Sequence, residues 1–517
     1  MNGSELKKEF GDYQTPDFFA ETVCSLLRDK LGISPEVVLE PTSGLGNFLQ
    51  ASLNCFPGIK RAYGLEVNPV YCEMCRKRIP DERLQVINDN FFSYPIEQHI
   101  GEEETLFVGN PPWATNSELN FNLPEKENFK RLSGTDAITG ASNFDICEYM
   151  ILKLIEKSVN KKVSIAMLCK TSVARNVLLE LDRNDTCIDS VKMYHFNSSK
   201  IFGISASACL LFVKMSTDNG KCRVCEVYDI DNPDSMKGQI TFENGRLSNS
   251  REDIVDLEGA CSLIWRQGVK HDCAGVMELE KTGAGSYRNK NKEEIELEET
   301  LVFPLMKSSF FKKPVICTDF KKYVIVTQKK VREETGYIEQ LAPKTWEYLC
   351  QRKAQFNSRK SSIYKGAPPF SMFGVGDYSY APYKVGISGF YKKPLFCLLY
   401  NGERIEQPVM PDDTSYFLSF DNYADAYTCM LLLNSSGVQE FLLSISFQDA
   451  KRPYTKKVLQ RLDFTKCIEL IPFDELVKTE KELNLAETIT EEMYIRFGTY
   501  IMGLKKAEQT YFELRGD

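Results

Sequence analysis

Two successive prolines directly after a hydrophobic run constrain this chain more than any other feature. The run from Thr105 to Val108 favours a β-strand, and Gly109 leads from it into Asn110-Pro111-Pro112-Trp113. Because each proline fixes φ and lacks an N–H donor, the segment can continue neither as a helix nor as a central strand. We therefore expect a rigid corner at the carboxyl end of a strand, where open α/β sheets place their ligands.

The groups at this corner suit a planar amine. Asn110 supplies an amide oxygen, and the carbonyl of Pro111 lies outside any regular ladder. Trp113 adds a large flat face on which a ring can stack. The motif alone leaves open a second interpretation, in which it is a structural proline turn with a buried tryptophan.

A glycine-rich turn follows an earlier hydrophobic strand. The strand at 37–39 runs into Glu40, and Gly44 and Gly46 come shortly afterwards, with a helix expected from Asn47. Glycines allow a ligand to approach the backbone closely. The third glycine of a dinucleotide fingerprint and the lysine of a phosphate-binding loop are both missing. The turn therefore favours an uncharged or zwitterionic group over a phosphate.

Two further strands end in polar residues. Glu66 closes the strand at 62–67, 20 residues beyond Gly46, the spacing at which an acid takes ribose hydroxyls. Asp89 follows the strand at 84–87 and is suited to an exocyclic amine, with Asn90 and Phe91 beside it. Together with the glycine turn and Asn110, these strand ends predict a nucleoside pocket next to an amine-binding corner.

The segments on either side complete one domain. Thr15 is predicted to cap a helix that begins at Pro16. The last two strands, 191–196 and 206–215, are joined by too few residues for a crossover helix, so we expect an antiparallel pair. Phe202 lies in this connection, either as a packed loop residue or as a second ring facing Trp113.

This succession of motifs resembles the γ-group of bacterial amino-methylating DNA adenine-N6 methyltransferases of restriction-modification systems. The resemblance covers residues 10 to 215 and implies the α/β fold of class I methyltransferases that use S-adenosylmethionine. That fold is Rossmann-like, with a seven-stranded mixed sheet whose last strand is antiparallel. We expect it in residues 1–216, followed by a C-terminal α+β target-recognition domain with terminal helices in 217–517.

The resemblance also implies a role for each motif residue. The methionine part of S-adenosylmethionine would lie against Thr15, Gly44 and Gly46, with Glu40 nearby. Glu66 would bind its ribose, Asp89 its adenine amine, and Asn90 or Phe91 its ring. Asn110 and Pro111 would hold the target amine at the corner that Pro112 helps to fix, and Trp113 and Phe202 would stack on the flipped base. Trp113 stands where the family more often has Tyr or Phe, and Pro41-Thr-Ser-Gly44 is a variant of the glycine motif.

The expected function is site-specific methylation of adenine N6 in double-stranded DNA after base flipping, as the modification part of a restriction-modification system. A cognate restriction endonuclease is then an expected partner. RNA adenine, cytosine N4 and a protein glutamine remain alternative substrates of the same fold. A modification subunit that needs a separate specificity partner, or an inactive DNA-binding relative, is an alternative of another kind.

Composition and charge indicate where the protein acts and which ligands it can bind. The 17 cysteines form no dense framework, the chain begins with polar residues, and no apolar run reaches the ~18 residues of a membrane span, so we expect a cytoplasmic protein without a membrane. Cys72-x-x-Cys75 and Cys222-x-x-Cys225 are far apart and the chain has only three histidines, so no metal site is expected. The net charge of −8 excludes a non-specific nucleic-acid coat, although basic segments at 321–332, 352–365 and 451–457 allow a local basic surface. We expect a monomer or weak dimer.

Overall fold

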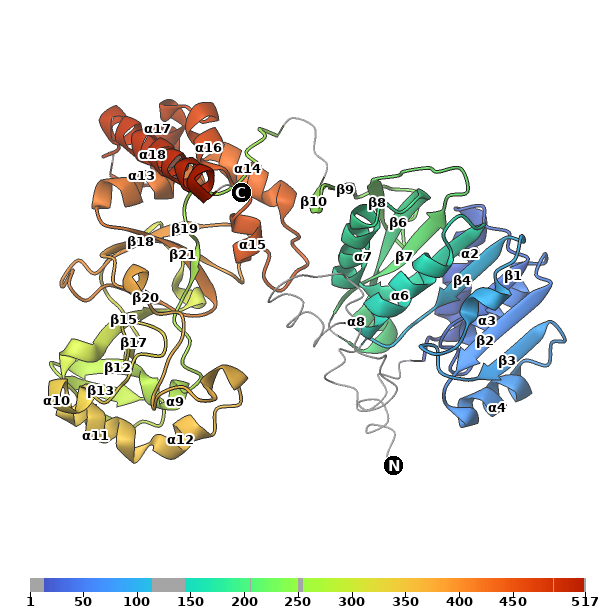
Figure 1. Ribbon diagram of the computed structural model, residues 1–517, viewed down its shortest axis with the longest axis horizontal. Coiled ribbons are helices and arrows are strands. Elements are labelled where there is room, and N and C mark those ends of the chain that lie inside the picture. Colours follow the sequence, from blue (N-terminus) through green and yellow to red (C-terminus); the bar gives the residue numbers. More distant parts are fainter. Residues whose placement is uncertain (1–13, 114–144, 205, 250–253, 487, 516–517) are drawn as a thin grey trace. The chain divides into compact units, whose positions relative to one another are not determined.

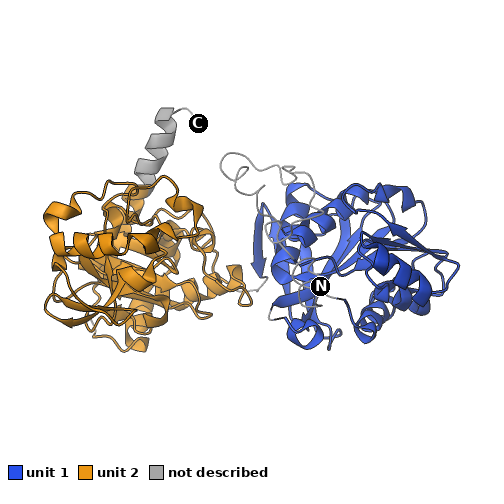
Figure 2. Ribbon diagram, turned by 90° about the horizontal axis from the view of Figure 1, so that it is seen from below, with its two compact units in different colours: residues 1–250 blue, residues 251–517 orange. Residues whose placement is uncertain are grey.

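The computed structural model describes residues 14–113, 145–204, 206–249, 254–486 and 488–515 (Figure 1). The chain forms two compact units, residues 1–250 and 251–517 (Figure 2). Each unit has its own hydrophobic core, and each is described by itself below.

Unit 1 is built on one sheet, whose strands lie in the order β10-β9-β8-β6-β7-β5-β4-β1-β2-β3. Strands β3, β2, β1, β4 and β5 are parallel to one another, and β7 is antiparallel to both β5 and β6. The expected seven-stranded mixed sheet is therefore confirmed in β1 to β7. The strands are β1 Val37–Glu40, β2 Arg61–Glu66, β3 Leu84–Asn88, β4 Thr105–Gly109, β5 Val163–Lys170, β6 Ile188–Asn197, β7 Ser207–Met215, β8 Val224–Asp229, β9 Gly238–Glu243 and β10 Arg246–Asn249.

Three strands beyond the expected seven extend the sheet at β6. Strand β8 pairs in parallel with β6, and β9 and β10 continue from it as antiparallel neighbours. Their pairing satisfies the backbone groups that β6 would otherwise expose at an edge. The expected boundary after residue 216 lies between β7 and β8, whereas the compact units divide between Ser250 and Arg251.

Every residue of β1 and β4 is buried, because helices cover both faces of this sheet. The helices are α2 Asp17–Asp29, α3 Asn47–Cys55, α4 Pro69–Arg78, η1 Ile96–His99, α6 Ile146–Lys157, α7 Thr171–Arg183 and α8 Ser198–Phe202. Cys72 and Cys75 lie buried in α4. Within the described ranges, no three His, Cys, Asp or Glu side chains are grouped so that they could hold a metal ion.

The prediction that Thr15 caps the first helix is wrong. Pro16 is the N-cap of α2, with an extended ψ of 143°, and its carbonyl accepts from the N–H groups of Phe19 and Ala20. Thr15 is instead turned inward and is 5% exposed. Its carbonyl accepts a hydrogen bond from the side-chain amide of Asn47. A contact with the first residue of α3 has therefore replaced the local cap.

Unit 2 combines two sheets with helices. One sheet has the order β11-β21-β18-β19-β16 and the other β14-β13-β12-β17-β15-β20. Helix α13 packs on β18 and β19 and is buried throughout residues 425–433, while α10 to α12 accompany the second sheet. The strands are β11 Arg266–Gln267, β12 Glu278–Gly283, β13 Ser286–Asn289, β14 Glu294–Glu296, β15 Val302–Met306, β16 Val315–Ile316, β17 Tyr323–Ile325, β18 Tyr383–Ser388, β19 Phe396–Leu399, β20 Met410–Pro411 and β21 Ser415–Phe420.

The longer helices of unit 2 gather near its C-terminal end. The α-helices are α9 Ala274–Met277, α10 Ile338–Leu341, α11 Pro343–Gln351, α12 Lys353–Asn357, α13 Tyr423–Asn434, α14 Ser436–Ile445, α15 Lys456–Leu459, α16 Phe464–Leu470, α17 Phe473–Glu482 and α18 Glu491–Arg515. The 3-10 turns are η2 Glu299–Leu301, η3 Ser308–Phe310, η4 Ser362–Tyr364 and η5 Asp377–Ser379. Of the helices in the described residues of both units, none is long and apolar enough to cross a membrane.

Candidate active site

Four strand ends meet at one edge of the sheet in unit 1. Strands β1, β2, β3 and β4 are parallel, so their carboxyl ends lie at the same edge (Figure 1). The order β2-β1-β4-β5 reverses between β1 and β4, which is where open α/β sheets form a ligand crevice. Glu40, Glu66, Asp89 and Asn110 stand at these ends, as the sequence predicted.

The glycine turn after β1 requires glycine at two positions. Gly44 and Gly46 have φ values of 50° and 81°, in the left-handed region that disfavours other residues. A Cβ on Gly44 would lie 2.6 Å from the side-chain oxygen of Gln14, and one on Gly46 would lie 2.5 Å from the sulfur of Cys75. The turn is therefore closely packed on both sides.

Gln14 is a site residue that sequence reasoning missed. Its side-chain oxygen accepts a 3.1 Å hydrogen bond from the N–H of Leu45, in the middle of the glycine turn. Asn47 likewise binds the carbonyl of Thr15. The segment before α2 is thereby fixed against the turn. The sequence signal was only the position of Gln14 beside the Thr15-Pro16 motif.

Glu66 is held in one orientation by two backbone donors. The N–H of Gly44 donates to Oε2 at 2.8 Å, and the N–H of Asn68 donates to Oε1 at 2.8 Å. The side chain is half-buried at the end of β2. Each carboxylate oxygen has further acceptor capacity, so the group can also bind the hydroxyls of a ligand.

Glu40 is an acid buried at the centre of the strand ends. It is 3% exposed, and its Oε2 atom has no hydrogen-bond partner in the described part of the chain. Burial, with the nearby charge of Glu66, raises the pKa of Glu40 well above its usual value. Gly109 allows this packing, since a Cβ there would lie 3.4 Å from Cγ of Glu40. Buried polar atoms are normally satisfied, so this oxygen suits a polar or cationic ligand.

The end of β3 offers an exposed acid and a half-buried amide. Asp89 is exposed, and its Oδ1 accepts from the N–H of Asn90 at 2.7 Å. Phe91 is 5% exposed, and the ammonium of Lys153 lies 5.4 Å from its ring centroid. Asn90 and Phe91 were both predicted to contact the adenine ring of the cofactor, and Asn90 is the more accessible of the two.

The proline corner holds Trp113 firmly. The indole N–H donates to the carbonyl of Leu168 on β5 at 3.3 Å. The ring of Phe202 meets the indole edge to face, with centroids 5.6 Å apart and planes at 74°. Phe202 also contacts Phe19 and Phe196, which makes it part of a packed cluster. The two rings leave no space between them for a planar base.

Comparison with known proteins decides the family. No family model matches the chain. The chain is 38% identical over 488 residues to the type II methyltransferase M.NspV of a Nostoc species, which covers 91% of this chain and 99% of that protein. The chain belongs to the type II DNA methyltransferases. It accordingly has the class I methyltransferase fold and uses S-adenosylmethionine to methylate DNA.

Solved structures resemble this methyltransferase only distantly. The modification subunit of a type I restriction-modification system from Streptococcus thermophilus is 13% identical, covers 44% of this chain and 49% of its own, and has a TM-score of 0.31. The type IIG restriction endonuclease BpuSI is 12% identical, covers 95% of this chain and 65% of its own, and has a TM-score of 0.33. Neither bears on the base that this methyltransferase modifies.

The residues at the strand ends fit the methyl donor. The buried oxygen of Glu40 suits its cationic methionine part. Glu66 offers an oriented carboxylate for two ribose hydroxyls. The comparison confirms a type II DNA methyltransferase that uses S-adenosylmethionine, while the γ-group, adenine N6 and the individual residue roles stay predictions.

Proposed function

We propose that this methyltransferase transfers a methyl group to the N6 amine of adenine at a specific site in double-stranded DNA. The observation that carries the proposal is the Asn110-Pro111-Pro112-Trp113 corner, which ends β4 directly beside β1 and the buried Glu40. A restriction-modification role, with a cognate endonuclease and a monomer or weak dimer in solution, belongs to the same proposal.

The target base must leave the duplex, because N6 is not accessible to chemistry within the stack. Trp113 provides the stacking face, since its indole is anchored through Leu168 and cannot turn freely. Base stacking on an aromatic ring is worth ~1–3 kcal/mol. For Phe202 to take the opposite face of the base, its ring has to move away from Trp113.

The amine needs activation, because its lone pair is conjugated with the purine ring. Asn110 and the carbonyl of Pro111 accept hydrogen bonds from the two N–H groups and draw the nitrogen toward tetrahedral geometry. When bound, S-adenosylmethionine supplies an electrophilic methyl group. Asn110 and the Pro111 carbonyl would hold N6 in place as it accepts this methyl group and then loses one proton to water. Most of the rate enhancement comes from positioning and preorganised dipoles.

Unit 2 is proposed to recognise the DNA sequence. The described part of unit 1 forms the sheet, its helices and the strand-end site, whereas unit 2 carries the basic segments at 321–332, 352–365 and 451–457. Phosphate contacts position a protein on DNA and base contacts specify the sequence, so a second unit of this kind supplies both.

Modified-base sequencing of DNA from a methylation-deficient host that expresses this chain tests the proposal. We expect N6-methyladenine at one recurring sequence and no other modified base. The Asn110→Ala variant expressed in the same host is the control, and its DNA should carry little or no modification. Finding N4-methylcytosine, or methylation without a recurring sequence, would refute the assignment.

A further inference from the structure

A cavity in unit 2 has a lining rich in positive charge. It has a volume of about 380 Å³ and lies between α12 and the segment 359–370. Its lining includes Lys353, Arg359, Lys360 and Lys365 and contains no Asp or Glu. A concave site of this size accommodates part of a small ligand or one unit of a polymer. The charge of the lining selects an anion.

The three lysines of the lining have no acidic partner in the part of the chain that the structure describes. Lys353, Lys360 and Lys365 are exposed, and among the described residues none of them forms an ion pair. Elsewhere in unit 2, an exposed lysine is matched: Lys344 binds Glu296 at 3.0 Å. The positive charge of the cavity is therefore available to a ligand.

Arg359 forms the wall of the cavity, and its guanidinium is engaged by neighbouring groups of the protein. Its guanidinium stacks on the ring of Tyr364, 3.7 Å from the centroid. It donates to the carbonyls of Phe356 at 3.0 Å, His271 at 3.1 Å and Ser371 at 2.6 Å. An arginine that reads a guanine needs both arms of its fork. With its donors turned to the backbone, Arg359 is suited to shaping the cavity.

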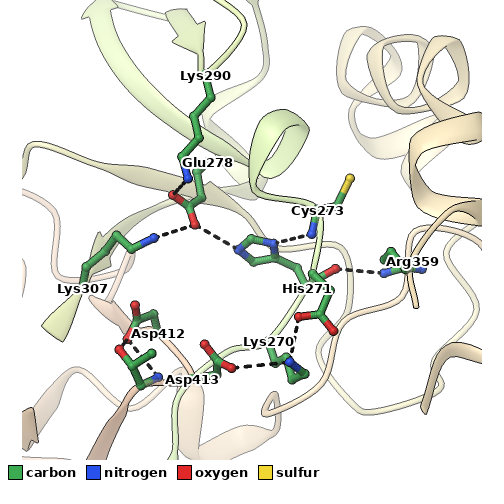
Figure 3. Close-up of polar contacts among 11 residues, drawn as sticks. Lys270, His271, Cys273, Glu278, Lys290, Lys307, Arg359, Asp412 and Asp413 are labelled. Atoms are coloured by element: carbon green, nitrogen blue, oxygen red, sulfur yellow. Dashed lines mark hydrogen bonds and ion pairs between the residues drawn. The ribbon is translucent and has the colours of Figure 1, made fainter. Parts of the chain in front are cut away.

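The lysines behind this wall are paired with carboxylates (Figure 3). The carboxylate of Glu278 lies 2.7 Å from the ammonium of Lys307, 3.0 Å from that of Lys290 and 3.7 Å from His271. Burial lowers the pKa of His271 to about 4, so its imidazole is neutral at physiological pH. Lys290 and Lys307 are thus paired with this buried acid, whereas the three lysines of the cavity have no such partner among the described residues.

A second basic segment is tied to the same wall. Gln328 is buried, accepts from the N–H of Met372 at 2.8 Å and donates to the hydroxyl of Ser371 at 3.3 Å. The turn that follows it carries three exposed cations, and Glu333 holds the turn by accepting from two of its backbone N–H groups at 2.5 and 3.2 Å. These cations are Lys329, Lys330 and Arg332. The cavity thus has further positive charge on a rigid neighbouring turn.

The apolar part of the lining identifies the kind of anion. Ala367, Pro368 and Pro369 offer small apolar surfaces beside the lysines. A lone phosphate would leave these surfaces uncovered, whereas a sugar-phosphate unit places its deoxyribose against them and its anion at the lysines. We propose that this cavity receives the sugar-phosphate backbone of DNA, and that Lys353, Lys360 and Lys365 are its phosphate contacts. This inference rests on the proposed role of unit 2 in DNA binding.

The test is the salt dependence of DNA binding by the full chain carrying Lys360→Ala and Lys365→Ala. Each phosphate contact contributes about 0.9 to the slope of log affinity against log salt. Because two contacts are lost, we expect the slope to flatten by about 1.8 and affinity at 0.1 M salt to fall on the order of 60-fold. The loss should be the same for target and unrelated duplexes, because phosphates carry no sequence information.

A matched control removes two exposed lysines elsewhere in unit 2. The Lys312→Ala, Lys313→Ala double variant loses the same charge outside the cavity and should keep the wild-type slope. Thermal melting of the full chain, compared with wild type, shows whether unit 2 is folded in both variants. An unchanged slope in the cavity variant, or an equal change in the control, overturns the inference. If the modified base proves not to be adenine, the proposed function fails while the slope comparison remains valid.

Discussion

The backbone N–H of Gly44 donates a 2.8 Å hydrogen bond to the carboxylate of Glu66. This bond joins the turn after β1 to the end of β2, so the acid that ends β2 is oriented by the glycine turn of the neighbouring strand. A second bond from Asn68 fixes the other oxygen. The site is thus preorganised before any ligand binds, which lowers the cost of ordering it on binding.

Removal of the Glu66 carboxylate is expected to weaken S-adenosylmethionine binding about 10- to 100-fold. Hydrogen bonds to a charged group contribute ~1.5–3 kcal/mol each, and 1.4 kcal/mol corresponds to tenfold. Titration calorimetry on Glu66→Ala measures the effect. Glu103→Ala is the control, since Glu103 pairs with Arg61 at the opposite edge of the sheet. Equal affinities for wild type and Glu66→Ala would remove Glu66 from the cofactor site.

Cofactor binding is expected to release a proton from Glu40. Burial raises the pKa of this acid well above 4.5 in the folded protein, and the adjacent positive charge of the ligand lowers it again. Affinity should therefore rise with pH from about 4.5 to the raised pKa and then level off. Calorimetry in buffers with different heats of ionisation counts the proton. In Glu40→Gln the release should vanish, and an unaltered release would assign it to another group.

The same raised pKa makes Glu40 unfavourable for folding at higher pH. When the pKa of an acid is higher in the folded than in the unfolded state, the folded state holds the proton more tightly. The acid therefore favours folding while it is protonated, and this contribution disappears once it is ionised in both states. The contribution is lost as pH rises from about 4.5 through the folded pKa. Without ligand, Glu40→Gln should therefore melt at a higher temperature than wild type above that window, and at nearly the same temperature below pH 4.5.

Loss of the Asn110 amide should slow methyl transfer by ~10²–10³ in Asn110→Ala, as is usual when one preorganised dipole is removed from a reacting centre. Both prolines remain, so the corner keeps its shape. Cofactor affinity should change little, because Glu66 and the glycine turn are intact. The measurement is single-turnover transfer with both ligands saturating. A near-wild-type rate would make the corner purely structural.

Truncation of Trp113 should act on base capture. Trp113→Ala removes the stacking face, worth ~1–3 kcal/mol, and should reduce the fluorescence change of an adenine analogue at the target position. Trp113→Phe keeps a ring and loses only the bond to Leu168. We expect it to retain most of the signal. If the alanine variant captures the analogue as wild type does, the flipped base lies elsewhere.

Lys384 in β18 should make unit 2 less stable as pH falls. It is fully buried, its ammonium donates to the carbonyl of Ala381 at 2.7 Å, and burial lowers its pKa to about 7. The free energy of unfolding of unit 2 is therefore highest above pH 10.5, and it decreases as the pH is lowered from 10.5 to about 7. At pH 7, Lys384→Met should therefore be more stable than wild type by on the order of a few kcal/mol, and it should melt at a higher temperature. The difference should shrink toward pH 10.5.

The matched control for this prediction is Lys393→Met, at an exposed lysine of the same unit. It should leave the melting temperature nearly unchanged at both pH values. A Lys384→Met variant that is less stable than wild type at pH 7 would show that the lost hydrogen bond outweighs the relief of the buried charge.

The sequence alone determined β1 to β7 of unit 1 and the residues at the ends of β1 to β4. Hydrophobic runs that stop at Glu40, Glu66, Asp89 and Gly109 specify short buried strands, and glycine and proline restrict the turns that follow. These rules act within a few residues, so they can be read from the chain. Parallel strands then bring their ends together without further information.

Tertiary structure alone decided the contacts between distant segments. The side chain of Gln14 binds the N–H of Leu45 in the distant glycine turn. The carbonyl of Thr15 accepts from Asn47, and the ring of Phe202 packs edge to face on Trp113. In the same way, β8 was added to the edge at β6, and the walls of the lysine-lined cavity were assembled from separate segments. Such contacts depend on which of many competing packings buries the most surface with every polar group satisfied. That balance is a property of the whole fold, and no local pattern records it.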